Sequence, residues 1–360
     1  MASPKRRAET APAHRPSADA GTDLLVIEGL DVVYGGGGGG GVFGLSPRTG
    51  FRAVAGVDLA LRRGESVAIV GESGSGKTSL LQALVGLAPV AAGRVRLGDV
   101  ELTRLRGRDV RRARRDMQFV FQDPYSSLDP SMRIGQLLDE PLRVHLRSWS
   151  RAQREERVRE VIESVGLATS VLGRYPNEFS GGQRQRIAIA RALTVEPKVL
   201  LLDEPVSALD GSTQGQVLNL LHDIQQRTGV AYLMVAHDLP LVRLFADRIA
   251  VMYQGRVVES GPAAALMAAP RHPYTRSLLD ASPLPNPTVQ RARPRVTLPD
   301  ETSDAPTPPC CAFAPRCPER FDRCDAEAPA AYPVGPDRLA RCFLHAEGTD
   351  ALEASDAPHA

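Results

Sequence analysis

Gly71-Glu-Ser-Gly-Ser-Gly-Lys-Thr78 matches the pattern G-x-x-x-x-G-K-[ST], and the chain is best interpreted outward from it. The run before it, Ser66-Val-Ala-Ile-Val70, is short and mostly apolar, which predicts a buried strand. Residues 79–87 carry apolar side chains at helical spacing and predict a helix. A glycine-rich turn between a strand and a helix directs backbone N–H groups and the positive end of the helix dipole at an anion. The stretch therefore predicts a phosphate-binding loop.

Each residue type in the loop has an expected role. Gly74 and Gly76 allow the backbone to curl around phosphate oxygens. Lys77 would reach the β- and γ-phosphates of a nucleotide, and the Thr78 hydroxyl would ligate Mg²⁺. Only three of the chain's 44 cationic residues are lysines, so a lysine where the motif requires one argues against a chance glycine-rich turn. The residues expected to bind nucleotide here are Gly71, Ser73, Gly74, Ser75, Gly76, Lys77, Thr78 and Ser79.

The composition is that of an ordinary globular protein. Of 360 residues, 42% are hydrophobic and 24% are charged, and the net charge is +2. So small a net charge gives no reason to expect nucleic acid as a partner. The chain has no apolar run of the roughly 18 residues that a membrane span needs, and residues 1–21 lack the apolar stretch of a secretory signal. We expect a cytosolic protein that meets any membrane through a partner.

A second motif, Val199-Leu-Leu-Leu-Asp-Glu204, places two carboxylates after an apolar run that predicts a buried parallel strand. Asp203 is placed to hold the Mg²⁺ shell, and Glu204 to polarise the attacking water as a general base. The phosphate-binding loop earlier in the chain disfavours the alternative, which is a pair of acids on an ordinary surface turn.

Three further stretches each allow two interpretations. Gln122 ends a predicted strand, where it would ligate Mg²⁺ or hold a water at the ligand-binding edge of a parallel sheet, or simply flank a turn. Ser180-Gly-Gly-Gln183 opens a predicted helix and is either an anion site or a plain cap by Ser180. His237 follows a predicted strand and either hydrogen-bonds the γ-phosphate or is a satisfied strand-end histidine.

The N-terminal part is less regular. Residues 1–22 are rich in Ala, Pro, Arg and Ser and are interpreted as a disordered tail. Residues 24–34 and 54–61 predict strands on either side of the glycine run Gly35–Gly41, which suggests a small antiparallel layer. Tyr34, at the end of the first strand, is a candidate to stack on an adenine base, and half-buried packing is the alternative.

Taken in order, these motifs resemble the ATP-binding subunit of ABC transporters over residues 24–345. The resemblance implies the α/β P-loop NTPase fold of ABC ATPases, with an antiparallel β layer and a helical subdomain. Two such domains enclose two ATP molecules, so Ser180–Gln183 would serve the partner's nucleotide and Ser207–Asp210 would communicate between the sites. The resemblance implies that Tyr34 is the adenine-stacking aromatic and that Gln122 is the glutamine of the glutamine loop. It implies that Glu204 and His237 are catalytic. The signature would consist of Ser180, Gly181, Gly182 and Gln183.

Five stretches narrow the resemblance to the ATPases of oligopeptide and dipeptide importers, most of all to the second of their two paired ATPase subunits. They are FQDPYSSLDP (121–130), EPLRVH (140–145), EFSGGQRQRIAIARAL (178–193), DEPVSALD (203–210) and HPYTRSLLDASP (272–283). The implied cofactors are ATP and Mg²⁺. The implied partners are a second ATPase subunit, homologous or identical, two transmembrane permease subunits and, indirectly, a solute-binding protein, with this chain peripheral on the cytoplasmic face of the cell membrane.

Other functions within the same fold are weighed against peptide import. Related ATPases serve nickel and oligosaccharide importers, and this subunit would not touch the solute. Non-transport ABC ATPases of DNA repair or translation usually carry two cassettes or a long coiled-coil insertion, and neither is visible in this sequence.

The five cysteines all follow residue 309. Four of them, Cys311, Cys317, Cys324 and Cys342, have the spacing C-x5-C-x6-C-x17-C, and Cys310 is expected to lie outside the set. Four thiolates can hold an iron–sulfur cluster or zinc, although the C-x-x-C knuckle of structural zinc sites is absent. Because some peptide-importer ATPases carry a [4Fe–4S] cluster in a similar extension, the cluster is favoured over zinc and free thiols.

The chain is thus expected to have four parts. They are a disordered tail (1–22), an ABC ATP-binding domain (23–276), a cysteine-containing C-terminal extension (277–345) and a second disordered tail (346–360).

Overall fold

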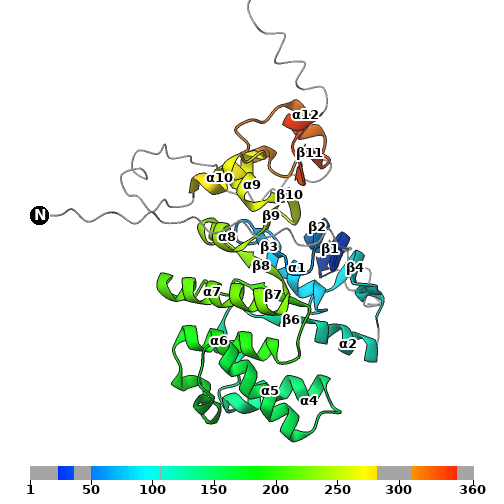
Figure 1. Cartoon of the computed structure of the whole chain (residues 1–360). Helices are drawn as coiled ribbons and strands as arrows, with labels where there is room; N and C mark the ends of the chain where they lie inside the picture. The colour runs from blue at the N-terminus through cyan, green and yellow to red at the C-terminus, as the bar shows by residue number, and fades with distance from the viewer. Residues whose placement is uncertain (1–22, 36–49, 106, 282–309, 347–360) are drawn as a thin grey trace, which may run out of the picture.

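The computed structural model describes residues 23–35, 50–105, 107–281 and 310–346 (Figure 1). Within these residues the strands form a four-stranded sheet of order β2-β1-β4-β5 and an eight-stranded sheet of order β11-β12-β10-β9-β3-β8-β7-β6. The predicted tails, apart from Ala346, and the glycine run beyond Gly35 lie outside the described residues.

The strands are β1 (Leu25–Tyr34), β2 (Phe51–Leu61), β3 (Ser66–Val70), β4 (Val90–Leu97), β5 (Val100–Glu101), β6 (Met117–Val120), β7 (Val199–Asp203), β8 (Ala231–Ala236), β9 (Arg248–Tyr253), β10 (Arg256–Pro262), β11 (Tyr332–Gly335) and β12 (Arg338–Ala340). The α-helices are α1 (Lys77–Leu84), α2 (Arg108–Asp116), α3 (Pro124–Ser127), α4 (Ile134–His145), α5 (Arg151–Ser164), α6 (Gly181–Leu193), α7 (Gly211–Thr228), α8 (Leu239–Phe245), α9 (Ala263–Ala268), α10 (Pro273–Ala281) and α12 (Asp322–Ala326). Short 3₁₀ helices cover Leu102–Arg104, Thr169–Gly173, Pro176–Glu178, Ala314–Arg316 and Phe343–His345.

The centre of the larger sheet is parallel and buried. Every residue of β3 and β7 is buried, as expected for apolar strands covered on both faces. In the parallel register Val70 pairs with Ala236, and Asp203 pairs with Val235. The carboxyl ends of β3, β7 and β8 therefore lie at one edge of the sheet, which is where ligands bind in folds of this kind.

Two further layers flank this sheet. The four-stranded sheet is antiparallel, and its core is continuous with α1, whose Leu80 and Leu81 are fully buried. Helices α4, α5 and α6 form a helical subdomain below the sheet (Figure 1), with Leu138, Ile162 and Ile187 fully buried in its core. The antiparallel layer and the helical subdomain are both as expected from the sequence.

The cysteine-containing segment shares the larger sheet. Strand β12 pairs antiparallel with β10, and Glu259 lies opposite Ala340. Arg338 of β12 donates a 3.0 Å hydrogen bond to Glu259, and the two side chains are 8% and 0% exposed. The carboxylate of Glu259 also accepts the backbone N–H groups of Arg271 and His272. The expected boundary after residue 276 falls inside α10, and the division into domains stays a prediction.

We expect Arg338→Met to lower the free energy of unfolding by about 3 kcal/mol, because it leaves the buried Glu259 carboxylate without its cation. Urea unfolding followed by circular dichroism measures the change. As a matched control, Arg320→Gln breaks the half-exposed ion pair with Asp325 in the same segment and should cost less than about 1 kcal/mol. Equal effects of the two variants would contradict the role given to the buried pair.

Candidate nucleotide-binding and hydrolysis site

The phosphate-binding loop is packed tightly between two strand ends. Gly76 has a φ of 98°, and a Cβ added there would lie 2.1 Å from the carbonyl oxygen of Ala53. A Cβ at Gly71 would lie 2.1 Å from the carbonyl oxygen of Met252. Both glycines are therefore required by space, and Gly76 is also required by its left-handed backbone.

Lys77 points into this loop and is 6% exposed. Its Nζ donates to the carbonyl oxygens of Gly71 at 2.9 Å and of Glu72 at 2.7 Å. Burial lowers the pKa of Lys77, and the nearby carboxylates of Glu204 and Asp203 oppose that shift. The ammonium thus lies inside the loop, and its contact with phosphate stays a prediction.

Thr78 and Asp203 come together at the end of β7. The Thr78 hydroxyl donates a 3.0 Å hydrogen bond to Oδ1 of Asp203, and Asp203 is buried. Burial raises the pKa of Asp203, and the hydrogen bond from Thr78 opposes the rise. A hydroxyl and a carboxylate at this distance provide oxygen ligands of the kind that Mg²⁺ prefers, so the pair fits the predicted ion.

Two further predicted residues, Gln122 and His237, meet at Glu204. It has a φ of 44°, a strained value for a residue other than glycine, which turns its side chain out of the strand direction. Its Oε2 accepts a 2.9 Å hydrogen bond from Nε2 of Gln122 and lies 3.2 Å from Nδ1 of His237. Gln122 therefore contacts the expected general base, and its place in a Mg²⁺ shell stays a prediction.

The predicted signature lies elsewhere. Ser180 caps α6, and its side chain and that of Gln183 exchange hydrogen bonds with each other's backbone N–H. A Cβ on Gly182 would lie 2.3 Å from Cγ2 of Thr213, so only glycine lets α6 begin against α7. Helix α6 stands apart from α1 in Figure 1, so the structure does not bring this stretch to the phosphate-binding loop of the same chain.

Two aromatic residues lie in the antiparallel layer, which contacts the loop through Ala53. Tyr34 is half-buried against the core of the antiparallel layer and pairs with Phe51 across β1 and β2. Phe51 is 68% exposed and lies two residues before Ala53, whose carbonyl touches Gly76. The sequence analysis missed Phe51, and the available signal was an aromatic residue on the far side of the glycine run from Tyr34.

The cysteine set does not form a metal site in the described residues. Cys324 is buried, and its carbonyl oxygen accepts a 2.8 Å hydrogen bond from the backbone N–H of Cys311. Burial raises the pKa of Cys317 to about 11 and that of Cys342 to about 12, with neighbouring thiols adding to both rises. Within the described ranges, no group of three or more His, Cys, Asp or Glu side chains is placed to hold a metal ion. The expected iron–sulfur cluster is therefore not supported.

Comparisons with known proteins identify related chains. The ABC transporter family matches residues 54–207, and the C-terminal region of oligopeptide/dipeptide transporters matches residues 258–324. A probable peptide ABC transporter ATP-binding protein of Sinorhizobium fredii is 46% identical over 82% of this chain and 83% of its own length. A putative peptide import ATP-binding protein of Brucella abortus is 46% identical over 82% of this chain and 87% of its own length.

Solved structures share the fold. The chain is similar to cbiO1 of Clostridium perfringens, part of the ABC transporter complex cbiONQ, with a TM-score of 0.58 and 27% identity over 68% of this chain and 91% of that one. It is equally similar to a dimeric ATP-binding cassette in a post-hydrolysis state bound to ADP and phosphate, with a TM-score of 0.58 and 29% identity over 67% of this chain and 99% of that one.

The fold and the relatives together define an ABC transporter ATP-binding subunit, and the predicted ABC ATPase fold is confirmed. Within that class, the chain belongs to the family of peptide import ATP-binding proteins. Membership implies ATP hydrolysis, dimerisation of the ATP-binding subunits and a permease partner. In the part of the chain that the structure describes, no helix has the length and apolar character of a membrane span.

Gly76→Ala should raise the Kd for ATP more than about tenfold, because the added methyl group meets the Ala53 carbonyl and the left-handed backbone disfavours alanine. Titration with a fluorescent ATP analogue measures the affinity. Gly215→Ala, in the interior of α7, is the matched control, since a Cβ there has no neighbour within 4 Å. It should bind ATP like the parent chain, and unchanged affinity in Gly76→Ala would contradict the packing argument.

Proposed function

We propose that this chain energises the import of peptides, hydrolysing ATP between its own phosphate-binding loop and the signature of a partner subunit. The observation that carries the proposal is the convergence of Gln122 and His237 on one carboxylate oxygen of Glu204, beside the contact of Thr78 with Asp203. Peptide transport is supported by the relatives, which are named as peptide transporter or peptide import ATP-binding proteins.

In the proposed reaction each residue acts at a definite atom. The loop N–H groups and Lys77 Nζ would bind the β- and γ-phosphates, and Thr78 and Asp203 would hold Mg²⁺, with Gln122 as a further proposed ligand. Bound Mg²⁺ supplies charge neutralisation on the phosphate oxygens. Glu204 orients a water molecule and accepts its proton, and His237, 3.2 Å from the same carboxylate, contacts the γ-phosphate.

The base of the nucleotide needs a platform near Gly76. Tyr34 is the proposed one, and the exposed ring of Phe51 on the neighbouring strand is a second aromatic surface within the same layer. An aromatic ring stacks on adenine through its face. Phe51 is the more exposed of the two rings and therefore offers the larger contact area.

Dimerisation would complete the site. Gly182 of the signature lies against Thr213, which follows the predicted communicating loop Ser207–Asp210. Asp210 caps α7 through Thr213, so these stretches form one continuous surface. We infer that this surface faces the partner's nucleotide, in a heterodimer with a homologous ATPase or in a dimer of this chain.

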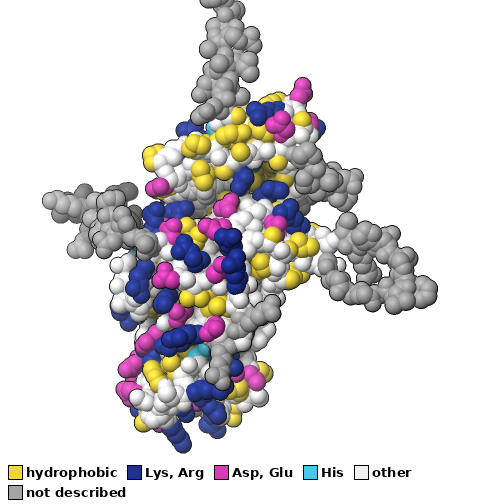
Figure 2. Space-filling view, turned by 90° about the vertical axis from the view of Figure 1, so that its right-hand side faces the viewer, with side chains coloured by type: hydrophobic (Ala, Val, Ile, Leu, Met, Phe, Trp, Pro, Cys, Tyr) yellow, Lys and Arg dark blue, Asp and Glu magenta, His cyan; other side chains and the backbone are white. Residues whose placement is uncertain are grey.

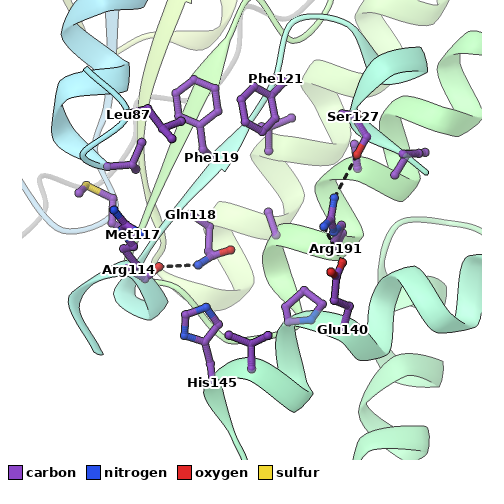
Figure 3. Close-up of a pocket in the computed structure, with 17 residues that line it drawn as sticks. Leu87, Arg114, Met117, Gln118, Phe119, Phe121, Ser127, Glu140, His145 and Arg191 are labelled. Carbon is purple, nitrogen blue, oxygen red and sulfur yellow. Dashed lines mark hydrogen bonds and ion pairs between the residues drawn. The ribbon is translucent and has the colours of Figure 1, made fainter. Parts of the chain in front are cut away.

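A groove between β6 and the helical subdomain is the proposed seat of the permease. It encloses about 350 Å³ and is lined by Phe119, Phe121, Pro141 and Val144, among others (Figure 3). Phe121 is 44% exposed and Val144 is 43% exposed, which leaves apolar surface for a partner to cover.

The charges at the rim of this groove favour a partner segment that carries an acidic side chain. Arg114 is exposed on one wall, and on the opposite wall Arg191 is already paired with Glu140 at 2.7 Å. Burial lowers the pKa of His145, and the charges of Arg115 and Arg111 lower it further, so its imidazole is neutral near pH 7. A short cytoplasmic helix of a permease subunit, apolar on one face and carrying a carboxylate, fits these walls.

The groove and the hydrolysis site are connected by two consecutive residues, Phe121 and Gln122. Phe121 lines the groove and packs at a tilt against Phe119, with ring centroids 4.6 Å apart. It is followed by Gln122, which contacts Glu204. A displacement of Phe121 would therefore act on Gln122, the next residue in the chain, which contacts the proposed general base. Charges of both signs intermix over the face shown in Figure 2.

Glu204→Gln should lower ATP turnover by about 10²- to 10⁴-fold while ATP still binds, because the amide keeps the size of the side chain and cannot accept the proton of water. Phosphate release measures turnover, and size-exclusion chromatography with ATP shows whether a dimer accumulates. Glu163→Gln, on the exposed face of α5, is the matched control. Turnover like that of the parent chain in Glu204→Gln would refute the assigned role.

Val144→Asp should abolish recovery of the permease with the tagged chain, because it places a charge on the apolar wall of the groove. The measurement is a pull-down from detergent-solubilised membranes with identification by mass spectrometry, alongside ATP binding. Val100→Asp, which is also an exposed valine but lies outside the groove, should recover permease and a second ATPase subunit. Recovery of ribosomal or DNA-repair proteins without a permease would favour a non-transport function.

A further inference from the structure

Glu72, the second residue of the phosphate-binding loop, is held at both its backbone and its side chain. Its backbone N–H donates a 2.9 Å hydrogen bond to the hydroxyl oxygen of Tyr274 in α10. Its carboxylate accepts hydrogen bonds from both terminal nitrogens of Arg316, with N···O distances of 2.8 and 3.0 Å. Two residues far along the chain, at separations of 202 and 244 residues, therefore meet on one loop residue.

These contacts are largely withdrawn from solvent. The side chain of Arg316 is 11% exposed and that of Glu72 is 33% exposed, and Tyr274 is fully buried. A guanidinium that meets a carboxylate with two parallel N–H groups fixes its orientation as well as its distance. This pair is thus built to define the position of Glu72, and its burial limits screening by salt.

An aromatic cluster sets the positions of Tyr274 and Arg316. Tyr253, Tyr274 and Phe313 pack with ring centroids 4.6, 5.3 and 5.4 Å apart, and all three are buried. The Arg316 guanidinium lies 5.9 Å from the Tyr253 ring centroid. The cluster joins β9, α10 and the cysteine-containing segment, so the groups that grip Glu72 are themselves rigid.

The grip on Glu72 reaches the loop lysine directly. The carbonyl oxygen of Glu72 accepts the hydrogen bond from Lys77 Nζ at 2.7 Å. A displaced Glu72 would therefore move a partner of the ammonium that is proposed to bind the β- and γ-phosphates.

We propose that Arg316 and Tyr274 are positioning residues for ATP, which clamp the phosphate-binding loop through Glu72 in the conformation that receives phosphate. The cysteine-containing segment thereby sets the affinity of the chain for nucleotide. This inference rests on the phosphate-binding role proposed for the loop. It assigns a role in nucleotide binding to the cysteine-containing segment. In the described hydrogen bonds, that segment contacts neither the predicted general base nor the predicted signature.

The test is a double-mutant cycle on the full chain, with Arg316→Gln, Glu72→Gln and the double variant. Each single change should raise the Kd of a fluorescent ATP analogue about tenfold, since each removes a mostly buried charge-assisted pair. The double variant should be no weaker than either single one, because the two residues act through the same contact. The KM for ATP should rise in step while kcat at saturating ATP stays near the parent value, because the clamp acts on binding and not on the proton transfer.

Three further variants separate the clamp from a general loss of stability. Tyr274→Phe removes only the hydroxyl that accepts the Glu72 N–H, and it should weaken ATP binding several-fold, by the loss of about one hydrogen bond. Arg316→Lys keeps the charge without the fork and should bind with intermediate affinity. Arg320→Gln, in the same segment and paired with Asp325, is the matched control and should bind ATP like the parent chain.

The outcomes distinguish failure of the clamp from failure of the loop's role. Parent affinity in Arg316→Gln and Glu72→Gln, with binding lost in Lys77→Ala, would overturn the clamp and leave the loop's role intact. Parent affinity in Lys77→Ala would overturn the role of the loop itself. An equal loss in Arg320→Gln would show that the segment acts only through general stability and would overturn the clamp. Thermal unfolding checks each variant, and if Arg316→Gln fails to fold, Arg316→Lys and Glu72→Gln carry the same comparison.

Discussion

The carbonyl oxygens of Ala53 and Met252 approach Gly76 and Gly71 so closely that only a hydrogen atom fits between them and the loop. This constraint ties the phosphate-binding loop to both sheets at once, because Ala53 belongs to the antiparallel layer and Met252 to the larger sheet. Neither sheet alone can shape the loop. The order of strands, the burial of α1 and the choice of glycine at two positions all serve this one close contact.

The stretch after β6 connects the groove, the hydrolysis site and the signature helix. Phe121 lines the groove, Gln122 contacts Glu204, and the hydroxyl oxygen of Tyr125 would lie 3.7 Å from a Cβ on Gly181 at the start of that helix. The guanidinium of Arg184, on the same helix, lies 4.1 Å from the Tyr125 ring centroid. A single short segment thus touches the proposed permease seat, the hydrolysis site and the surface proposed for the partner's nucleotide. Such contiguity is the physical requirement for coupling hydrolysis to transport.

The sequence analysis succeeded where a motif and its local context carry the information. The strand, loop and helix around Lys77 follow from local rules, and the end of a buried strand places Asp203 and Glu204 at the ligand edge. It failed where position depends on distant residues. Pairing of β12 with β10, exposure of Phe51 and the grip of Arg316 on Glu72 have no local signal, because each depends on how separate elements dock. The cysteine spacing shows the same limit, since spacing alone does not determine whether thiols converge in space.

The sequence separation of 244 residues between Glu72 and Arg316 has a consequence for the synthesis of the protein. Ribosomes add about 5–20 residues per second, so the loop would wait about 12 to 50 seconds for the arginine that grips it. During that interval the nascent chain already contains the phosphate-binding motif, yet it lacks the contact that holds the motif in place. Synthesis order would then delay high-affinity ATP binding until the cysteine-containing segment has emerged and folded.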